Sequence, residues 1–229
     1  MARNPVAGSQ RTEPPPGPTT GDRAAAGVAG ADGSVTAAPI DVPVPGLVIL
    51  VGAAGAGKTT LATRLFARSE VLSSDALRAA ISGDPADQRA TRPAFGILHR
   101  EVRERLAGGR LVVVDATNVE ASARSTLRRL ADAASVPVVL IVIDLPAADV
   151  HARNAGRAGR IVPPDVVDRH LARLHGLGAS PETIAARLHA EGFATVHVLS
   201  SAAAIDAAVV RRVPRAGGAE RAPDGLSRP

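Results

Sequence analysis

The feature that most constrains this chain is the octapeptide GAAGAGKT at residues 52–59. It fits the pattern G-x-x-x-x-G-K-[S/T], follows the apolar run 46–52 and precedes a helical pattern over 58–68. Glycines let consecutive backbone N–H groups curl around phosphate oxygens, and a helix N-terminus adds partial positive charge. The order of strand, glycine-rich loop and helix therefore predicts a nucleoside triphosphate site rather than a turn without a ligand.

Each part of this loop has an expected task. We expect Lys58 to reach the β- and γ-phosphates of ATP, and the Thr59 hydroxyl to bind Mg²⁺. The residues predicted to bind the nucleotide are Gly52, Ala53, Ala54, Gly55, Ala56, Gly57, Lys58, Thr59 and Thr60.

Beyond the loop, short apolar runs alternate with longer helical patterns. The predicted strands are 46–52, 70–74, 111–117, 137–145 and 194–200. The predicted helices are 58–68, 75–82, 89–108, 120–134, 147–156, 164–176, 181–191 and 201–211. Strands that are apolar on both faces and alternate with helices indicate a parallel sheet covered on each side. The prediction is a doubly wound α/β domain of the P-loop NTPase or kinase fold, with about five strands flanked by helices.

The two ends of the chain differ from its middle. Residues 1–44 and 213–229 are rich in Pro, Gly and Ala without a sustained period, so we expect disordered tails around a kinase domain at 45–212. The absence of Cys excludes disulfides and thiolate metal sites. With no apolar run of bilayer length and no secretory signal, we expect a cytoplasmic protein without a membrane partner.

An acid and a base follow the second predicted strand in the stretch SSDALR, residues 73–78. Asp75 and Arg78 are three residues apart, which places them on one face of a helix at the ligand-binding edge of the sheet. Asp75 is placed to accept the proton of an attacking hydroxyl, and Arg78 to bind an anionic group of the acceptor. An equally open interpretation is that Asp75 caps the helix and pairs with Arg78 on the surface.

Asp115 ends the third predicted strand, in LVVVDATN (111–118). An acid at this position beside a phosphate-binding loop commonly holds Mg²⁺, often through water. The same carboxylate would also suit orienting a substrate hydroxyl or capping the next segment, and the spacing does not choose among these roles.

An arginine-rich segment follows the fourth predicted strand. Arg153, Arg157 and Arg160 cluster around Gly156 and Gly159, and a Pro-Pro pair stops the segment before the next helix. Such a segment predicts a lid that brings arginines to the transferring phosphoryl group and excludes water. The alternative is an ordinary solvated basic loop.

Taken in this order, the motifs GxxGxGKT, SSDALR, VVDATN and RNxxR followed by VP resemble the 5′-hydroxyl polynucleotide kinases. The kinase module of the bacterial RNA-repair kinase-phosphatase-ligase is more similar than the bacteriophage enzyme, and the resemblance covers 46–200. It implies transfer of the γ-phosphoryl group of ATP, with Mg²⁺, to a 5′-hydroxyl end of RNA or DNA.

The resemblance also implies residue roles. Asp75 is the general base, Arg78 contacts the phosphate on the 3′ side of the acceptor and helps to orient Asp75, and Arg157, with Arg153, contacts the donor phosphates. Asp115 and Asn118 belong to the DATN signature. No phosphatase or ligase module is recognised beside the kinase motifs, so we expect the protein to act alone or with separate phosphatase or ligase partners.

Two features depart from a typical nucleic-acid enzyme. The only aromatic residues are three Phe, which offers few base-stacking platforms. Four arginines would form a phosphate track or simply a solvated helix face: Arg89, Arg92, Arg100 and Arg103.

The alternatives to a polynucleotide kinase are a kinase for a small anionic alcohol, or a nucleotide-binding ATPase module without an acceptor. The net charge of +5 does not choose among them.

Overall fold

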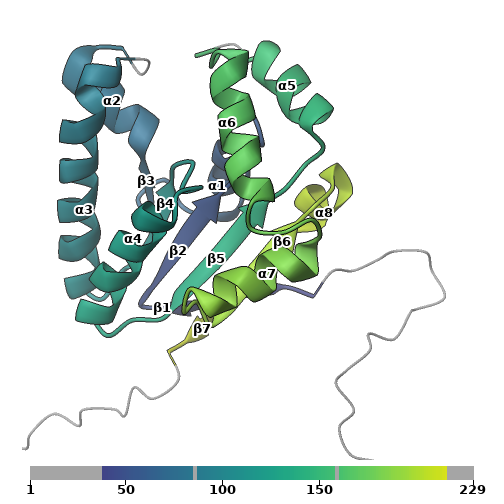
Figure 1. Ribbon diagram of the computed structural model, residues 1–229. Helices are drawn as coiled ribbons and strands as arrows, with labels where there is room; N and C mark the ends of the chain where they lie inside the picture. Colours follow the sequence, from purple (N-terminus) through teal and green to yellow (C-terminus); the bar gives the residue numbers. More distant parts are fainter. Residues whose placement is uncertain (1–37, 85–86, 158–159, 216–229) are drawn as a thin grey trace, which may run out of the picture. The chain divides into compact units, whose positions relative to one another are not determined.

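The computed structural model describes residues 38–84, 87–157 and 160–215 (Figure 1). Its centre is a five-stranded sheet of order β3-β4-β2-β5-β6, and all its strand pairs are parallel. The strands are β2 (Gly46–Val51), β3 (Val71–Ser73), β4 (Leu111–Asp115), β5 (Val138–Ile143) and β6 (Thr195–Leu199). This confirms the predicted α/β fold, and it places the glycine-rich loop after the central strand.

The central strands are buried on both faces, as their continuous apolar sequences predicted. Every residue of β2 and β4 is buried. Alternate side chains enter two different clusters: Val48 and Leu50 lie in one, and Leu47, Ile49 and Val51 lie in the other. A strand that must satisfy two cores has no polar face, which explains why its sequence reads as an apolar run.

Helices supply the second wall of each cluster. One cluster is closed by α1 (Lys58–Leu65), α5 (Ala147–Ala155), α6 (Pro164–His175) and α8 (Ala202–Ala207). The other is closed by α3 (Thr91–Ala107), α4 (Ala121–Ala133) and α7 (Pro181–Ala190). The helix α2 (Ser74–Ser82) packs beside α3 (Figure 1), and a short 3₁₀ turn at Gln88–Ala90 leads into α3. No helix in the described ranges is both long and apolar enough to cross a membrane.

The predicted tail boundaries are wrong at both ends of the domain. Residues Ile40–Val44 form β1, which pairs in parallel with β7 (Val210–Pro214) as a separate two-stranded sheet. The predicted helix over 201–211 accordingly ends at Ala207. The rest of both predicted tails, 1–37 and 216–229, lies outside the described residues.

The sequence hides this pair of strands because its partners are far apart in the chain. Pro43 interrupts the first segment, and the second is short, carries two arginines and ends at Pro214, so neither shows the uninterrupted apolar pattern of a buried strand. Ile40 and Val42 are nevertheless buried against the main core, and Arg211 donates two 2.7 Å hydrogen bonds to the Asp41 carboxylate. The β1–β7 sheet is therefore stabilised by contacts between distant parts of the chain, which exist only in the folded protein.

Candidate active site

The glycine-rich loop rests directly on α5. Gly55 and Gly57 have φ values of +90° and +104°, a backbone conformation that favours glycine. A Cβ on Gly55 would lie 2.7 Å from the Val150 carbonyl oxygen and 2.9 Å from the Asn154 Cβ. Glycine is therefore required here for two reasons, the positive φ and the close approach of the helix.

Lys58 lies over the loop that precedes it. Its Nζ donates to the carbonyl oxygens of Gly52 and Ala53 at 2.9 and 2.7 Å. Burial lowers the pKa of Lys58 to about 8, the charge of Asp115 acts in the opposite direction, and the charge of Arg157 lowers the pKa further. A triphosphate would offer this ammonium charged acceptors in place of neutral carbonyls, which would favour its protonated form.

Thr59 and Asp115 bring two hard oxygen atoms together. The Thr59 hydroxyl donates to Asp115 Oδ2 at 2.8 Å, joining the first turn of α1 to the end of β4. Among the described residues there is no cluster of three or more His, Cys, Asp or Glu side chains suited to a metal. The pair fits Mg²⁺, which typically takes one or two protein oxygens and completes its shell with phosphate oxygens and water.

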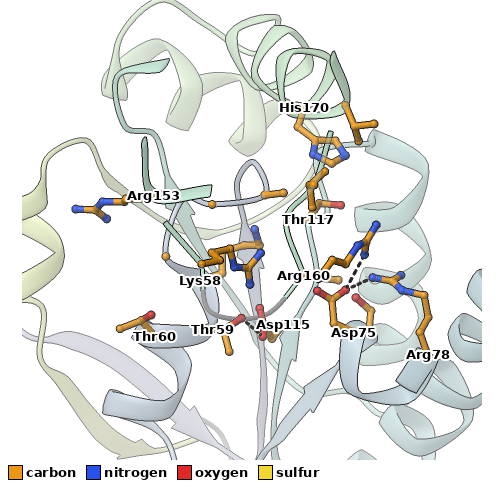
Figure 2. A pocket seen from close by; sticks show the side chains of 18 of the residues that line it. Lys58, Thr59, Thr60, Asp75, Arg78, Asp115, Thr117, Arg153, Arg160 and His170 are labelled. Atoms are coloured by element: carbon orange, nitrogen blue, oxygen red, sulfur yellow. Dashed lines mark hydrogen bonds and ion pairs between the residues drawn. The ribbon is translucent and has the colours of Figure 1, made fainter. Parts of the chain in front are cut away.

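A cavity of about 610 Å³ joins these groups to α2 and to the arginine-rich segment (Figure 2). All the predicted catalytic and metal residues line it: Lys58, Thr59, Asp75, Arg78, Asp115 and Arg157. Of the predicted nucleotide-binding residues, Ala54, Gly55, Gly57, Thr60 and Arg153 also line it. Three predicted nucleotide-binding residues are absent from the cavity lining and instead shape the loop: Gly52, Ala53 and Ala56. The carbonyl oxygens of Gly52 and Ala53 accept the hydrogen bonds from Lys58.

Asp75 lies in the first turn of α2, but it does not cap the helix. The cap is Ser73, whose hydroxyl accepts from the Ala76 amide. The Asp75 carboxylate is paired with Arg78, as the alternative interpretation expected. The Arg78 side chain is buried and that of Asp75 is 41% exposed, so the pair lies at the cavity wall rather than fully on the surface. Burial and the nearby charge of Arg160 lower the pKa of Arg78.

Arg160 reaches the same carboxylate from the opposite wall, with its Nη1 3.7 Å from Asp75 Oδ1. Figure 2 shows the two guanidinium groups converging on Asp75. In the sequence, Arg160 is one of three clustered arginines and has no separate predicted role. In the structure its guanidinium group lies beside the Asp75 carboxylate. Two residues of the predicted lid, Ala158 and Gly159, lie outside the described residues.

The two ends of the arginine-rich segment are tied together by Asn154. Its side chain donates to the Val162 carbonyl at 2.8 Å and accepts from the Val162 amide at 3.1 Å, and both residues are buried. Arg153 lies beside the loop, because a Cβ on Gly57 would come within 3.5 Å of its guanidinium group. Asn154 thus anchors the backbone from which the arginines extend.

His170 of α6 is a cavity residue that the sequence reasoning missed. Its Nδ1 is buried without a hydrogen-bond partner among the described residues. Burial lowers the pKa of His170 to about 4, and the charges of Lys58, Arg173, Arg169 and Arg160 act in the same direction. Helical spacing places His170 on the inward face with Val167 and Leu174, but such a position does not by itself separate a site residue from a core residue.

The loop after β4 is fixed from behind by a second missed residue, Arg124. This side chain is fully buried, and it donates to the carbonyl oxygens of Asn118 and Val119 at 3.0 and 2.8 Å. Its other nitrogens bind the Glu191 carboxylate at 2.9 and 2.6 Å, which links α4 to the end of α7. Asn118 has a φ of +48° and donates to the Leu50 carbonyl at 2.8 Å, so this loop is held to β2 as well.

The four arginines considered as a phosphate track lie elsewhere. Arg89, Arg92, Arg100 and Arg103 are all exposed, and none lines the cavity. The Arg100 guanidinium lies 3.9 Å from the Glu104 carboxylate on the same helix. This arrangement favours the interpretation as a solvated helix face.

Together, the central strand order, the glycine-rich loop and the Thr59–Asp115 pair define a P-loop protein of kinase-like α/β fold. Residues 47–181, more than half of the chain, match the family model described as "AAA domain". The chain belongs to this family. No curated protein matches the chain.

Several solved structures are similar to the chain. A gluconokinase from Sinorhizobium meliloti 1021 is 21% identical with a TM-score of 0.45, covering 70% of this chain and 85% of that one. A sugar kinase from Janibacter sp. HTCC2649 is 21% identical with a TM-score of 0.44, covering 68% and 84%. The Pnkp1/Rnl/Hen1 RNA repair complex is 23% identical with a TM-score of 0.48, covering 59% of this chain and 45% of the other.

Proposed function

We propose that this protein is an ATP- and Mg²⁺-dependent phosphotransferase that transfers the γ-phosphoryl group to the 5′-hydroxyl end of RNA or DNA. The observation that carries the proposal is the position of Asp75. Its carboxylate is held by Arg78 and Arg160 in the same cavity as Lys58 and the Thr59–Asp115 pair. A positioned carboxylate facing a phosphate-binding loop suits proton removal from an attacking alcohol.

In the proposed reaction the acceptor oxygen forms a bond to the γ-phosphorus while the bond to the β–γ bridging oxygen breaks. Asp75 takes the hydroxyl proton and later releases it to solvent, so the products are ADP and a phosphate monoester. Lys58 and Arg157 stabilise the negative charge on the transferring group. Mg²⁺ held by Thr59 and Asp115 would neutralise charge on the β- and γ-phosphates.

The charge around Asp75 supports an anionic acceptor. Among the described residues, five Lys or Arg side chains and three Asp side chains line this cavity, a positive balance that suits anionic ligands. A phosphate on the 3′ side of the reacting nucleoside would match that charge, in agreement with the role that the family resemblance implies for Arg78.

A second candidate is a kinase for a small alcohol that carries a carboxylate or phosphate. The lining of the cavity favours it in one respect, because Phe95 is the single Phe, Tyr or Trp among the described residues that line the cavity. One ring is a minimal platform for a nucleobase, whereas the arginines would bind any anion.

The experiment is a transfer assay with Mg²⁺ and ATP labelled on the γ-phosphate. The acceptors are 5′-hydroxyl and 5′-phosphate oligonucleotides, as RNA and as DNA, and a sugar acid such as gluconate. Label on the 5′-hydroxyl oligonucleotides alone is the expected result, and the ratio of RNA to DNA labelling identifies the substrate. Label on the sugar acid alone would favour the second candidate.

Asp75→Asn is the matched control for this assay, since it removes the base and keeps the shape. It should lower the rate of labelling by about 10²- to 10⁴-fold and leave the dissociation constant of ATP unchanged. ATP hydrolysis that no acceptor stimulates and that survives this substitution would contradict both kinase proposals.

A further inference from the structure

A second cavity, of about 400 Å³, lies between α3 and α4. Phe95 and Thr117 line both this cavity and the cavity that contains Asp75. The rest of its wall comes from the loop after β4 and from the first two turns of α4, including Ser122, Ala123 and Thr126. The two cavities therefore share a boundary on the acceptor side, beside the element that carries Asp75.

The chemistry of the second cavity differs from that of the first. The first is lined by five cationic side chains, Lys58, Arg78, Arg153, Arg157 and Arg160. Among the described residues, no cationic side chain lines the second cavity, and the one charged residue of its lining, Glu120, is paired with Arg173 of α6. The hydroxyl groups of Thr117, Ser122 and Thr126 and apolar surface remain, which suit a neutral, flat group with polar edges rather than a phosphate.

The aromatic ring of Phe95 lies at the boundary between the two cavities. Phe95 is partly buried, and its ring lies 6.0 Å from the ring of His99 at a tilt of 52°. Burial and the charge of Arg103 lower the pKa of His99, so the two rings form a neutral pair at neutral pH. A nucleobase entering the second cavity would meet the Phe95 ring, and stacking on one ring strengthens binding by about 5- to 150-fold.

We propose that the second cavity binds the nucleobase of the nucleotide on the 3′ side of the reacting nucleoside. The inference rests on the proposed function and names a subsite for it. The reacting hydroxyl lies at Asp75, the following phosphate at Arg78, and the next base passes Phe95 and Thr117 into the space beside Ser122 and Ala123. The protein therefore prefers acceptors of at least two nucleotides.

The first test compares three acceptors at saturating ATP: a nucleoside 3′-phosphate, a dinucleotide, and the same dinucleotide with an abasic second residue. We expect the KM of the dinucleotide to be about 5- to 150-fold lower than that of the other two, with similar kcat. An equal KM for the intact and abasic dinucleotides would overturn the inference. No label on any acceptor, with ATP still bound, would instead contradict the proposed function.

The second test fills the cavity. Ala123→Leu and Ser122→Leu add a side chain to its wall, and Ala133→Leu adds the same group to an exposed position at the end of α4. We expect Ala123→Leu and Ser122→Leu to raise the KM of the dinucleotide to that of the nucleoside 3′-phosphate. The KM values of the nucleoside 3′-phosphate and of ATP should not change. Ala133→Leu should leave all three unchanged.

Thermal unfolding of each variant guards against a general effect on folding. Ser122 is exposed, so its substitution keeps the test informative if Ala123→Leu does not fold. A dinucleotide KM that is unchanged in the folded Ser122→Leu variant, or that rises equally in Ala133→Leu, would contradict the proposed subsite.

Discussion

The two sides of the large cavity are built in opposite ways. The loop that carries Lys58 is a contiguous segment, and the lysine bonds to carbonyl groups only five and six residues earlier. The side around Asp75 is assembled from separate elements, because Arg78 comes from α2 and Arg160 from the segment before α6. The loop after β4, whose Thr117 borders the large cavity, is held by Arg124, which binds Glu191 across 67 positions.

This difference indicates where recognition and specificity lie. A local loop can bind the common part of every nucleoside triphosphate, so the same pattern serves many activities. The assembled side depends on which helices meet there, and substitutions in several of them can alter the acceptor. We therefore expect substitutions on the two sides to have separable effects on ATP binding and on transfer.

The largest expected effect is on the assembled side. Asp75→Asn should lower kcat by about 10²- to 10⁴-fold, because a general base typically contributes that factor. The dissociation constant of ATP should stay as in the unchanged protein, measured by calorimetry. A parallel loss of ATP binding would show that the two sides are not separable.

The next effect concerns Arg124, which holds the loop after β4. Arg124→Met should lower the free energy of unfolding by about 3–5 kcal/mol, because it leaves the Glu191 carboxylate without its partner and two carbonyls unsatisfied. Urea unfolding measures it. The control is Arg211→Met, which removes an exposed pair that also joins distant parts of the chain, 170 positions apart, and should cost far less. Equal losses of unfolding free energy in the two variants would contradict the expectation that the buried pair stabilises the fold more than the exposed pair.

On the loop side, Gly55→Ala should cost about 1–3 kcal/mol of stability and weaken ATP binding. The added Cβ meets α5 and the residue must keep a φ of +90°. Gly109→Ala is the matched control, with a φ of +70° and nothing within 4 Å of its Cβ. If both variants bind ATP and unfold alike, the contact with α5 has no consequence.

The smallest effect is a pH dependence confined to the loop side. Lys58 has a pKa of about 8, and a bound triphosphate favours the charged form, so binding takes up a proton above that pH. The ATP dissociation constant should rise by up to about tenfold per pH unit above pH 8, and stay flat below it. Lys58→Arg should remove this step, because arginine remains charged. A step that survives in Lys58→Arg would assign the titration to another group.

Much of the fold was predictable from the sequence because its signals are local. A strand that packs into two cores needs apolar side chains on both faces, and β2, β5 and the first four residues of β4 carry that pattern. The strands β1 and β7 were missed for the converse reason, since their pairing joins residues about 170 positions apart and their local pattern is broken by Pro43 in one strand and by two arginines in the other.

For the site, the sequence by itself determined the loop, its lysine and threonine, and the presence of acids at the ends of two strands. These are contiguous patterns, and backbone geometry alone brings strand ends to one edge of a parallel sheet. Only the tertiary structure decided that Arg160 reaches Asp75 and that His170 joins the cavity. The physical reason is that side chains on different helices meet only when packing fixes the helices against the sheet, and no spacing along the chain encodes that distance.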